Sequence, residues 1–192
     1  AHQSNHVSAA NEVANLNIEV VPLSIRFGDD EYTDREQLSV DRFYKLLASS
    51  DTLPETAAPS PGRFAESFQR HLDAGATAIV CINISAALSA TMQSAITAAD
   101  SMDADIRVVD STSITVGLGS IVIAAAEAAK NGASADEVVA IAESMSARTH
   151  VFGALDTLEN LQKGGRIGGA QALLGSMLSI KPLIDISTGE VE

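Results

Sequence analysis

The sequence is poor in cysteine, in aromatic residues and in positive charge. Cys81 is the only cysteine among 192 residues, so no disulfide can form within the chain. Aromatic residues make up 4% and tryptophan is absent, so the core must be packed mainly with Ala, Ile, Leu and Val. A net charge of -13 argues strongly against a nucleic-acid partner or an anionic membrane surface. No apolar run approaches the roughly 20 residues of a membrane span and no signal peptide is visible, so we expect a cytoplasmic protein.

Several common motifs of catalysis and ion binding are also absent. The sequence contains no GxSxG, GxxxxGK[ST], HExxH, paired CxxC or spaced Cys/His cluster, so we expect no metal ion and no cofactor. His71 and His150 stand alone in different segments, and their positions do not predict a catalytic triad. Cys81 lies inside an apolar segment, where it is expected to be a core residue and not a nucleophile.

The segment that organises the chain is 76–99, ATAIVCINISAALSATMQSAITAA. Its first part is β-branched and almost wholly apolar, which is typical of a strand buried on both faces of a mainly parallel sheet. Ser85 and Ser89 then interrupt the apolar run, and an alanine-rich helix begins near residue 89. Free N–H groups and the positive end of the helix dipole favour an anion there. We expect this loop to hold a small ligand by its negative end, although such serines are also common as simple helix caps.

The rest of the chain alternates predicted strands and helices. The expected strands are 18–27, 76–84, 106–109, 151–155 and 181–186, and the expected helices are 39–48, 61–74, 89–102, 115–130, 135–147, 158–163 and 170–178. Helix 115–130 is nearly all apolar, so we expect it to be central. This alternation predicts an α/β fold with a mainly parallel sheet flanked by helices.

Two stretches stand apart from this pattern. Residues 1–7, AHQSNHV, have no periodicity and are interpreted as an irregular start or a tag remnant. Residues 51–62 contain three prolines and predict a stiff loop, after which Ser60 caps a helix with Pro61 at its first position. Farther on, KGGRIGG at 163–169 has the composition of a phosphate-cradling loop, with a flexible helix connection as the alternative.

Five segments together resemble the DegV family of fatty-acid-binding proteins. They are FGDDEYTD, the LPETAAPSPG loop, ISAALSATMQSA, VVDSTSITVGLG and LQKGGRIGGAQALLGSMLSIKPLI, in family order across nearly all of residues 18–186. The last block is the most specific. The resemblance implies a bacterial carrier that holds one long-chain fatty acid and needs no cofactor. It also implies a partner, a fatty acid kinase, which phosphorylates the presented carboxylate to an acyl phosphate for lipid synthesis.

The resemblance also assigns roles to particular residues. Thr56 matches the family's carboxylate-binding Thr, and Ser89 matches its second carboxylate ligand, with Ser85 and Thr91 as supporting hydroxyls. Arg166 matches the family's Arg that is tied to kinase docking and phosphate transfer.

The chain departs from the family pattern in several places. Thr56 is followed by two alanines where Ser-Gln is usual, Ala86 replaces a Ser, and Ala90 replaces a Gly. The family's opening strand with its Thr-Asp-Ser motif is absent, and its second domain, about the last third, is missing beyond Glu192. Residues 8–192 are therefore expected to be a DegV-like domain that is incomplete at both ends relative to the family.

A fatty acid places simple physical demands on such a site. Burying about 14 methylenes at roughly 0.8 kcal/mol each gives an upper bound near 11 kcal/mol before binding entropy is subtracted. The small side chains of helices 90–102 and 115–130 offer room for the tail, with tight helix packing as the alternative. Uncharged hydroxyls and the helix starts after Ser60 and Ser89 would hold the head without a neutralising cation, so a carboxylate oxygen stays nucleophilic.

Two other functions stay open from the sequence. One is a stand-alone enzyme that acts on an anionic small molecule with Ser89 as its nucleophile, although no His or Lys lies nearby in sequence as its base. The other is a structural or interaction domain that binds no lipid.

Overall fold

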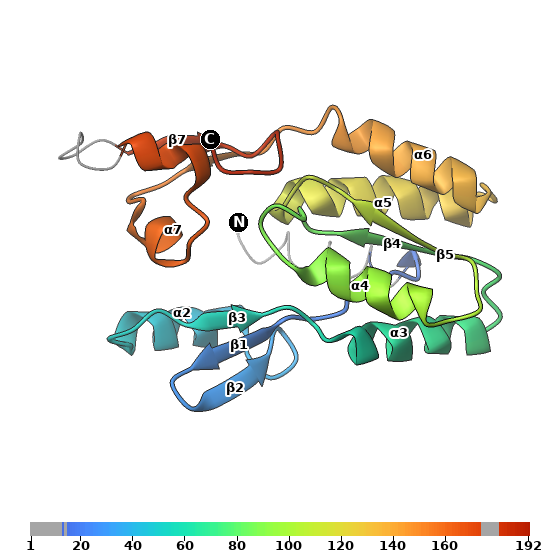
Figure 1. Ribbon diagram of the computed structural model, residues 1–192, viewed down its shortest axis with the longest axis horizontal. Coiled ribbons are helices and arrows are strands. Elements are labelled where there is room, and N and C mark those ends of the chain that lie inside the picture. Colours follow the sequence, from blue (N-terminus) through green and yellow to red (C-terminus); the bar gives the residue numbers. More distant parts are fainter. Residues whose placement is uncertain (1–12, 14, 174–180) are drawn as a thin grey trace.

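The computed structural model describes residues 13, 15–173 and 181–192, so the predictions for residues 1–7 and for the end of helix 170–178 lie outside the described residues (Figure 1). The strands are β1 (Ser24–Phe27), β2 (Asp30–Thr33), β3 (Glu55–Ala57), β4 (Ile79–Asn83), β5 (Ile106–Asp110), β6 (Phe152–Ala154) and β7 (Leu183–Asp185). The helices are α2 (Val40–Ser49), α3 (Pro61–Asp73), α4 (Thr91–Asp100), α5 (Thr115–Lys130), α6 (Ala135–Ser146), α7 (Glu159–Lys163) and the 3₁₀ helix η1 (Gly168–Leu173). The predicted α/β class is confirmed.

The centre of the molecule is the parallel pair β4 and β5, which has helices on both faces (Figure 1). On one face, Ile79, Cys81 and Val108 pack against the cluster that α3 and α4 form. On the other face, the alternate residues Val80 and Ile82 pack against the cluster shared by α5 and α6. The predicted packing of this strand on both faces is therefore confirmed, but four of its five residues are only partly buried. Burial raises the pKa of the Cys81 thiol to about 11, as suits a core residue.

The amino-terminal part forms an antiparallel sheet with the strand order β2-β1-β3. The expected strand 18–27 was too long, because regular pairing begins only at Ser24. Pro22 has no N–H to donate to a ladder, and Glu19 is held by ion pairs with Arg70 and His71 of α3. The stiff loop at 51–62 contains β3, which the sequence pattern does not predict because three polar or small residues carry no alternating signal.

The helices α5 and α6 lie together on one face of the parallel pair. The predicted bounds of α5 are confirmed, and so is the capping box at Ser134 and Glu137 that begins α6. The expectation that α5 is central was wrong. Only one stripe of it is buried, and Val116 is 77% exposed, because the helix covers a sheet face and is not enclosed on all sides.

The carboxyl-terminal part forms a separate small cluster around the antiparallel pair β6 and β7. Its buried members are Leu158, Ile167, Ala170, Ile184, Ile186 and Val191. The helix expected after residue 169 begins earlier and as a 3₁₀ helix, η1 at Gly168, a residue with a φ of +51° that a regular α-helix does not accommodate. No helix within the described residues is long and apolar enough to cross a membrane.

Candidate functional site

The loop that joins β4 to α4 lies at the carboxyl end of the parallel pair (Figure 1). Strand register pairs Asn83 with Asp110, so the loops that follow β4 and β5 begin at the same level. Figure 1 also shows that α3 and α4 lie side by side and begin at this same end of the strand pair. Strand ends and helix starts therefore meet here, which is where α/β proteins usually hold ligands.

Ser85 is the structural centre of this loop. Its N–H donates to the carbonyl of Ser113 at 3.0 Å, and its own carbonyl accepts from the N–H groups of Leu88 and Ser89 at 3.1 Å. Its hydroxyl donates to the carbonyl of Gly189 at 2.6 Å, and the side chain is 1% exposed. Every polar group of Ser85 is thus engaged by the protein itself.

Ser89 and Thr91 form a hydroxyl pair at the beginning of α4. Their side-chain oxygens lie 2.8 Å apart, and the Ser89 hydroxyl also accepts from the Thr91 N–H at 3.3 Å. The N-cap position is Ala90, which has no side-chain cap. If Thr91 donates its hydroxyl hydrogen to Ser89, the hydrogen of Ser89 is left for a ligand acceptor.

Asp110 ties the two loops together, although the motifs in the sequence did not single it out as a site residue. Its carboxylate accepts from the N–H of Ala86 at 3.2 Å and from the N–H of Thr112 at 2.8 Å. An acidic residue at the end of a strand that is parallel to the ligand-bearing strand is the sequence signal that would have found it. The carboxylate uses up N–H groups that would otherwise attract an anion.

The structure brings Arg166 to this loop but does not join Thr56 to it. The Nε of Arg166 donates to the carbonyl of Leu88 at 3.3 Å, and its Nη1 donates to the carbonyl of Gly164 at 2.6 Å. Thr56 is exposed on β3, opposite Ile25 of β1, and no hydrogen bond among the described residues links it to the β4–α4 loop. Four of the five predicted site residues therefore form one connected group.

The loop after β5 has two strained backbone positions and one buried hydroxyl that forms no hydrogen bond with the described residues. Thr112 and Thr115 have φ values of +47° and +49°, which are unfavourable for β-branched residues. Between them, Ser113 is 3% exposed, and its hydroxyl has no hydrogen-bond partner within the described part of the chain. A side chain at Gly117, in the first turn of α5, would collide with this hydroxyl, so the glycine is required for the close approach.

The alanine-rich helix faces do not leave room for an acyl tail. Ala95 and Ala98 of α4 are 0% and 1% exposed and pack directly against Phe64 and Phe68 of α3. Ala125 of α5 likewise packs against α6. The alternative of tight helix packing therefore holds on these faces, because small side chains let the helices approach each other closely.

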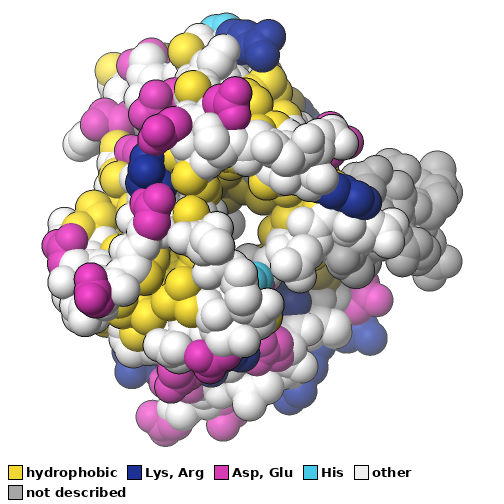
Figure 2. All heavy atoms as spheres, turned by 90° about the vertical axis from the view of Figure 1, so that its right-hand side faces the viewer, with side chains coloured by type: hydrophobic (Ala, Val, Ile, Leu, Met, Phe, Trp, Pro, Cys, Tyr) yellow, Lys and Arg dark blue, Asp and Glu magenta, His cyan; other side chains and the backbone are white. Residues whose placement is uncertain are grey.

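Apolar side chains that are only partly buried lie next to the hydroxyl loop instead. Leu88, within the loop, and Ile114, at the start of α5, pack against the carboxyl-terminal cluster without being fully covered. Val151, Leu155, Leu161 and Leu173 belong to the same partly buried set. A hollow surrounded by hydrophobic side chains is also seen in Figure 2, on the right-hand side of Figure 1, where α3 and α4 end.

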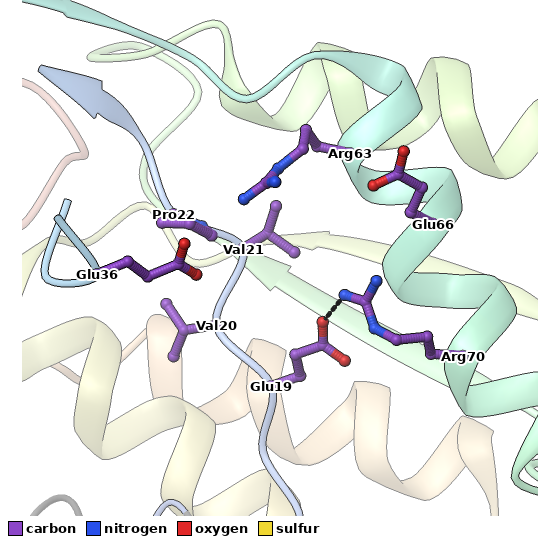
Figure 3. Close-up of a pocket in the computed structure, with 8 residues that line it drawn as sticks. All are labelled: Glu19, Val20, Val21, Pro22, Glu36, Arg63, Glu66 and Arg70. Carbon is purple, nitrogen blue, oxygen red and sulfur yellow. Dashed lines mark hydrogen bonds and ion pairs between the residues drawn. The ribbon is translucent and has the colours of Figure 1, made fainter. Parts of the chain in front are cut away.

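The pocket drawn in Figure 3 lies elsewhere and differs in character. It has a volume of about 180 Å³ and is lined by Glu19, Val20, Val21, Pro22, Glu36, Arg63, Glu66 and Arg70. An ion pair between Glu19 and Arg70 crosses its wall. Because most of its lining side chains are charged, it does not suit an acyl tail.

His150 has partners that the sequence did not predict. Its Nδ1 lies 2.8 Å from the hydroxyl of Ser187, and that hydroxyl donates to Asp185. Ser187 is the middle residue of these two hydrogen bonds, whereas in the catalytic triad of a hydrolase the histidine is the middle residue. Ser89 has no His or Lys partner among the described hydrogen bonds, and no group of three or more metal-binding side chains occurs in the described residues.

These features define a class of protein: an α/β protein with a candidate small-ligand site where two parallel strands end. Its distinguishing group is an uncharged hydroxyl pair at a helix start, beside partly covered apolar side chains.

The chain belongs to the DegV family, since the family model described as "Uncharacterised protein, DegV family" matches residues 7–192. A DegV domain-containing protein of Streptomyces coelicolor is 39% identical over 175 residues, which cover 91% of this chain and 62% of that protein. The resemblance inferred from the sequence motifs is therefore confirmed.

Two solved structures that are similar to this chain are described as fatty-acid-binding proteins. The DegV family protein from Thermus thermophilus, whose structure concerns fatty acid binding, has a TM-score of 0.86 and 35% identity. A stearic acid-binding protein from Eubacterium ventriosum has a TM-score of 0.85 and 27% identity. Each match covers 94% of this chain and 64% of the other, so this chain spans less than two thirds of the length of these relatives.

Proposed function

We propose that this chain binds a long-chain fatty acid with its carboxylate at the Ser89–Thr91 hydroxyl pair and presents that carboxylate to a fatty acid kinase. The observation that carries the proposal is the hydroxyl pair at the uncapped start of α4, with Leu88 and Ile114 beside it. The fatty acid binding described for the proteins from Thermus thermophilus and Eubacterium ventriosum supports the choice of ligand.

The head of the ligand is recognised by donors that carry no full charge. Ser89 donates its hydroxyl hydrogen to the carboxylate, and the hydroxyl of Thr91 donates to the oxygen of Ser89. The first N–H groups of α4 add the partial positive charge of the helix start. Thr56 is the second head ligand in the proposal. Its assignment rests on the family resemblance alone.

The tail follows the partly buried apolar side chains of the carboxyl-terminal cluster and not the faces of α4 and α5. Leu88 begins this path next to the head, and Leu155 and Leu161 continue it. This corrects the tail position that the sequence suggested, since Ala95 and Ala98 are covered by α3.

Arg166 serves the partner in this proposal. It is exposed, and it is anchored to the head loop through the carbonyl of Leu88. A guanidinium beside a carboxylate oxygen that stays nucleophilic suits the approach of a phosphoryl donor. The kinase partner and the cytoplasmic location both come from the family resemblance and form part of the proposal.

Native mass spectrometry of the purified chain tests the proposal directly. We expect a co-purified mass of a long-chain fatty acid that is lost on delipidation and restored by palmitate. A chain that carries no lipid and takes up none from palmitate would contradict it.

The serine-dependent enzyme is the second candidate, and no specific observation favours it. Incubation with an activated acyl ester separates the two. The carrier yields no covalent adduct, whereas a burst of acylated Ser89 in peptide mass mapping would favour the enzyme.

A further inference from the structure

We infer that the turn 186–189 near the carboxyl terminus is a strap that positions the head-binding loop, and that Gly189 and Ser85 are its positioning residues. This inference rests on the proposed function, since it concerns the geometry of the Ser89–Thr91 pair. Neither residue touches the ligand.

The strap reaches the loop through one buried hydrogen bond. The carbonyl of Gly189 accepts the hydroxyl of Ser85 at 2.6 Å, across 104 residues of sequence. Ser85 in turn fixes the N–H of Ser89 through its own carbonyl at 3.1 Å. The place of Ser89 is therefore set by a segment far along the chain, and the Ser85 hydroxyl, which was predicted to support the ligand, acts on the loop instead.

A glycine is required at position 189 for two separate reasons. Its φ is +89°, a conformation that side-chain-bearing residues adopt only with strain. A Cβ there would lie 3.0 Å from the Ser85 hydroxyl oxygen and 3.3 Å from the Cβ of Thr112. Any side chain would thus push both strand-end loops away from the strap.

The strap is itself held firmly on both sides. Asp185 and Glu192 exchange two backbone hydrogen bonds of 2.9 Å, which close the turn. Val191 is 2% exposed in the carboxyl-terminal cluster, and its carbonyl accepts from the N–H of Gly169 at 2.8 Å. Because the turn is anchored at these points, a Cβ at position 189 strains its contacts with Ser85 and Thr112 of the two strand-end loops.

The chain offers a matched control for each change. Gly75 has a φ of +93°, and a Cβ added there would meet no atom within 4 Å, so Gly75→Ala introduces the same strain without a collision. Ser113 is buried and its hydroxyl has no partner within the described residues, so Ser113→Ala removes a hydroxyl without breaking a hydrogen bond of that hydroxyl. Gly189→Ala is compared with Gly75→Ala, and Ser85→Ala is compared with Ser113→Ala.

The test measures dissociation constants for palmitate and for hexadecanol, which share a tail and differ in the head. We expect Gly189→Ala and Ser85→Ala to weaken palmitate binding by about tenfold, the scale of one charge-assisted hydrogen bond, with hexadecanol changed less than about twofold. Both controls should leave the ratio of the two constants at the wild-type value. A purely structural role would weaken both ligands together.

If the ratio of the palmitate and hexadecanol dissociation constants is the same in Gly189→Ala as in Gly75→Ala, the inference is overturned. If the wild-type chain does not bind palmitate at all, the proposed function fails, and amide NMR signals then decide the inference separately. If the strap positions the loop, the amide chemical shifts of Ser89 and Thr91 change in Gly189→Ala and do not change in Gly75→Ala. Unmoved signals in both variants would overturn it.

Discussion

The helices α3 and α4 begin at the same end of the strand pair, but they use their hydroxyls differently. At the start of α3, the Ser60 side chain accepts from the Arg63 N–H at 3.3 Å, and Pro61 occupies the first helical position. At the start of α4, the N-cap is Ala90, and the hydroxyls of Ser89 and Thr91 bond to each other.

The difference teaches that a serine before a helix must be judged by what its hydroxyl already binds. Ser60 is used as a cap, so its role is stability. The Ser89 hydroxyl likewise accepts from a helix N–H, that of Thr91 at 3.3 Å, but it is paired in addition with the Thr91 hydroxyl, which can turn the hydrogen of Ser89 toward a ligand. The sequence predicts the cap at Ser60 but leaves Ser89 open between a cap and a ligand site, and each of the following changes tests whether the two serines differ.

The largest effect is expected for Ser89→Ala. Loss of one hydrogen bond to a charged group costs about 1.5–3 kcal/mol, so palmitate binding should weaken roughly tenfold or more. Titration calorimetry with delipidated protein measures it, and thermal unfolding reports separately the cost of losing the Ser89 bonds to the hydroxyl and N–H of Thr91. Affinity equal to that of the wild type would remove Ser89 from the site.

Arg166→Ala is expected to separate presentation from binding. Palmitate affinity should stay within about twofold, while acyl-phosphate formation with the cognate kinase should fall about tenfold, because a charge that faces the partner is lost. Arg63→Ala, which removes an exposed arginine near the start of α3, is the control for general charge. A fall in palmitate affinity would instead move Arg166 into the ligand site.

Ser60→Ala should do the opposite of Ser89→Ala. Loss of the cap should lower the free energy of unfolding by about 1 kcal/mol and leave palmitate binding unchanged. Urea denaturation measures the first and calorimetry the second. Ser60→Asp keeps an accepting side chain and should retain the stability. A variant that binds palmitate poorly while staying fully stable would show that α3 uses its serine as α4 does.

Thr56→Val should give the smallest effect. The side chain is exposed on β3, so we expect palmitate binding to weaken only about threefold, near the low end for one hydrogen bond. Thr56→Ser keeps the hydroxyl and should bind as the wild type does. If Thr56→Val and Thr56→Ser have the same affinity, the hydroxyl of Thr56 plays no part in the site.

The sequence predicts most elements but not their partners. Pro61 after Ser60, and the capping box at Ser134, fix helix starts because they act within a few residues. The short strand β3 and the bond between Ser85 and Gly189 depend on contacts between distant segments, which no local pattern encodes. The same is true of Arg166, whose place beside Leu88 follows only from the folded chain.

Asp110 has a consequence for dynamics. One carboxylate holds the amide hydrogens of Ala86 and Thr112, which belong to different loops. Loss of the carboxylate would weaken both bonds at once, so hydrogen–deuterium exchange at both amides should become faster together in Asp110→Asn. The link between the loops after β4 and β5 would then be lost, and the two loops would fluctuate independently.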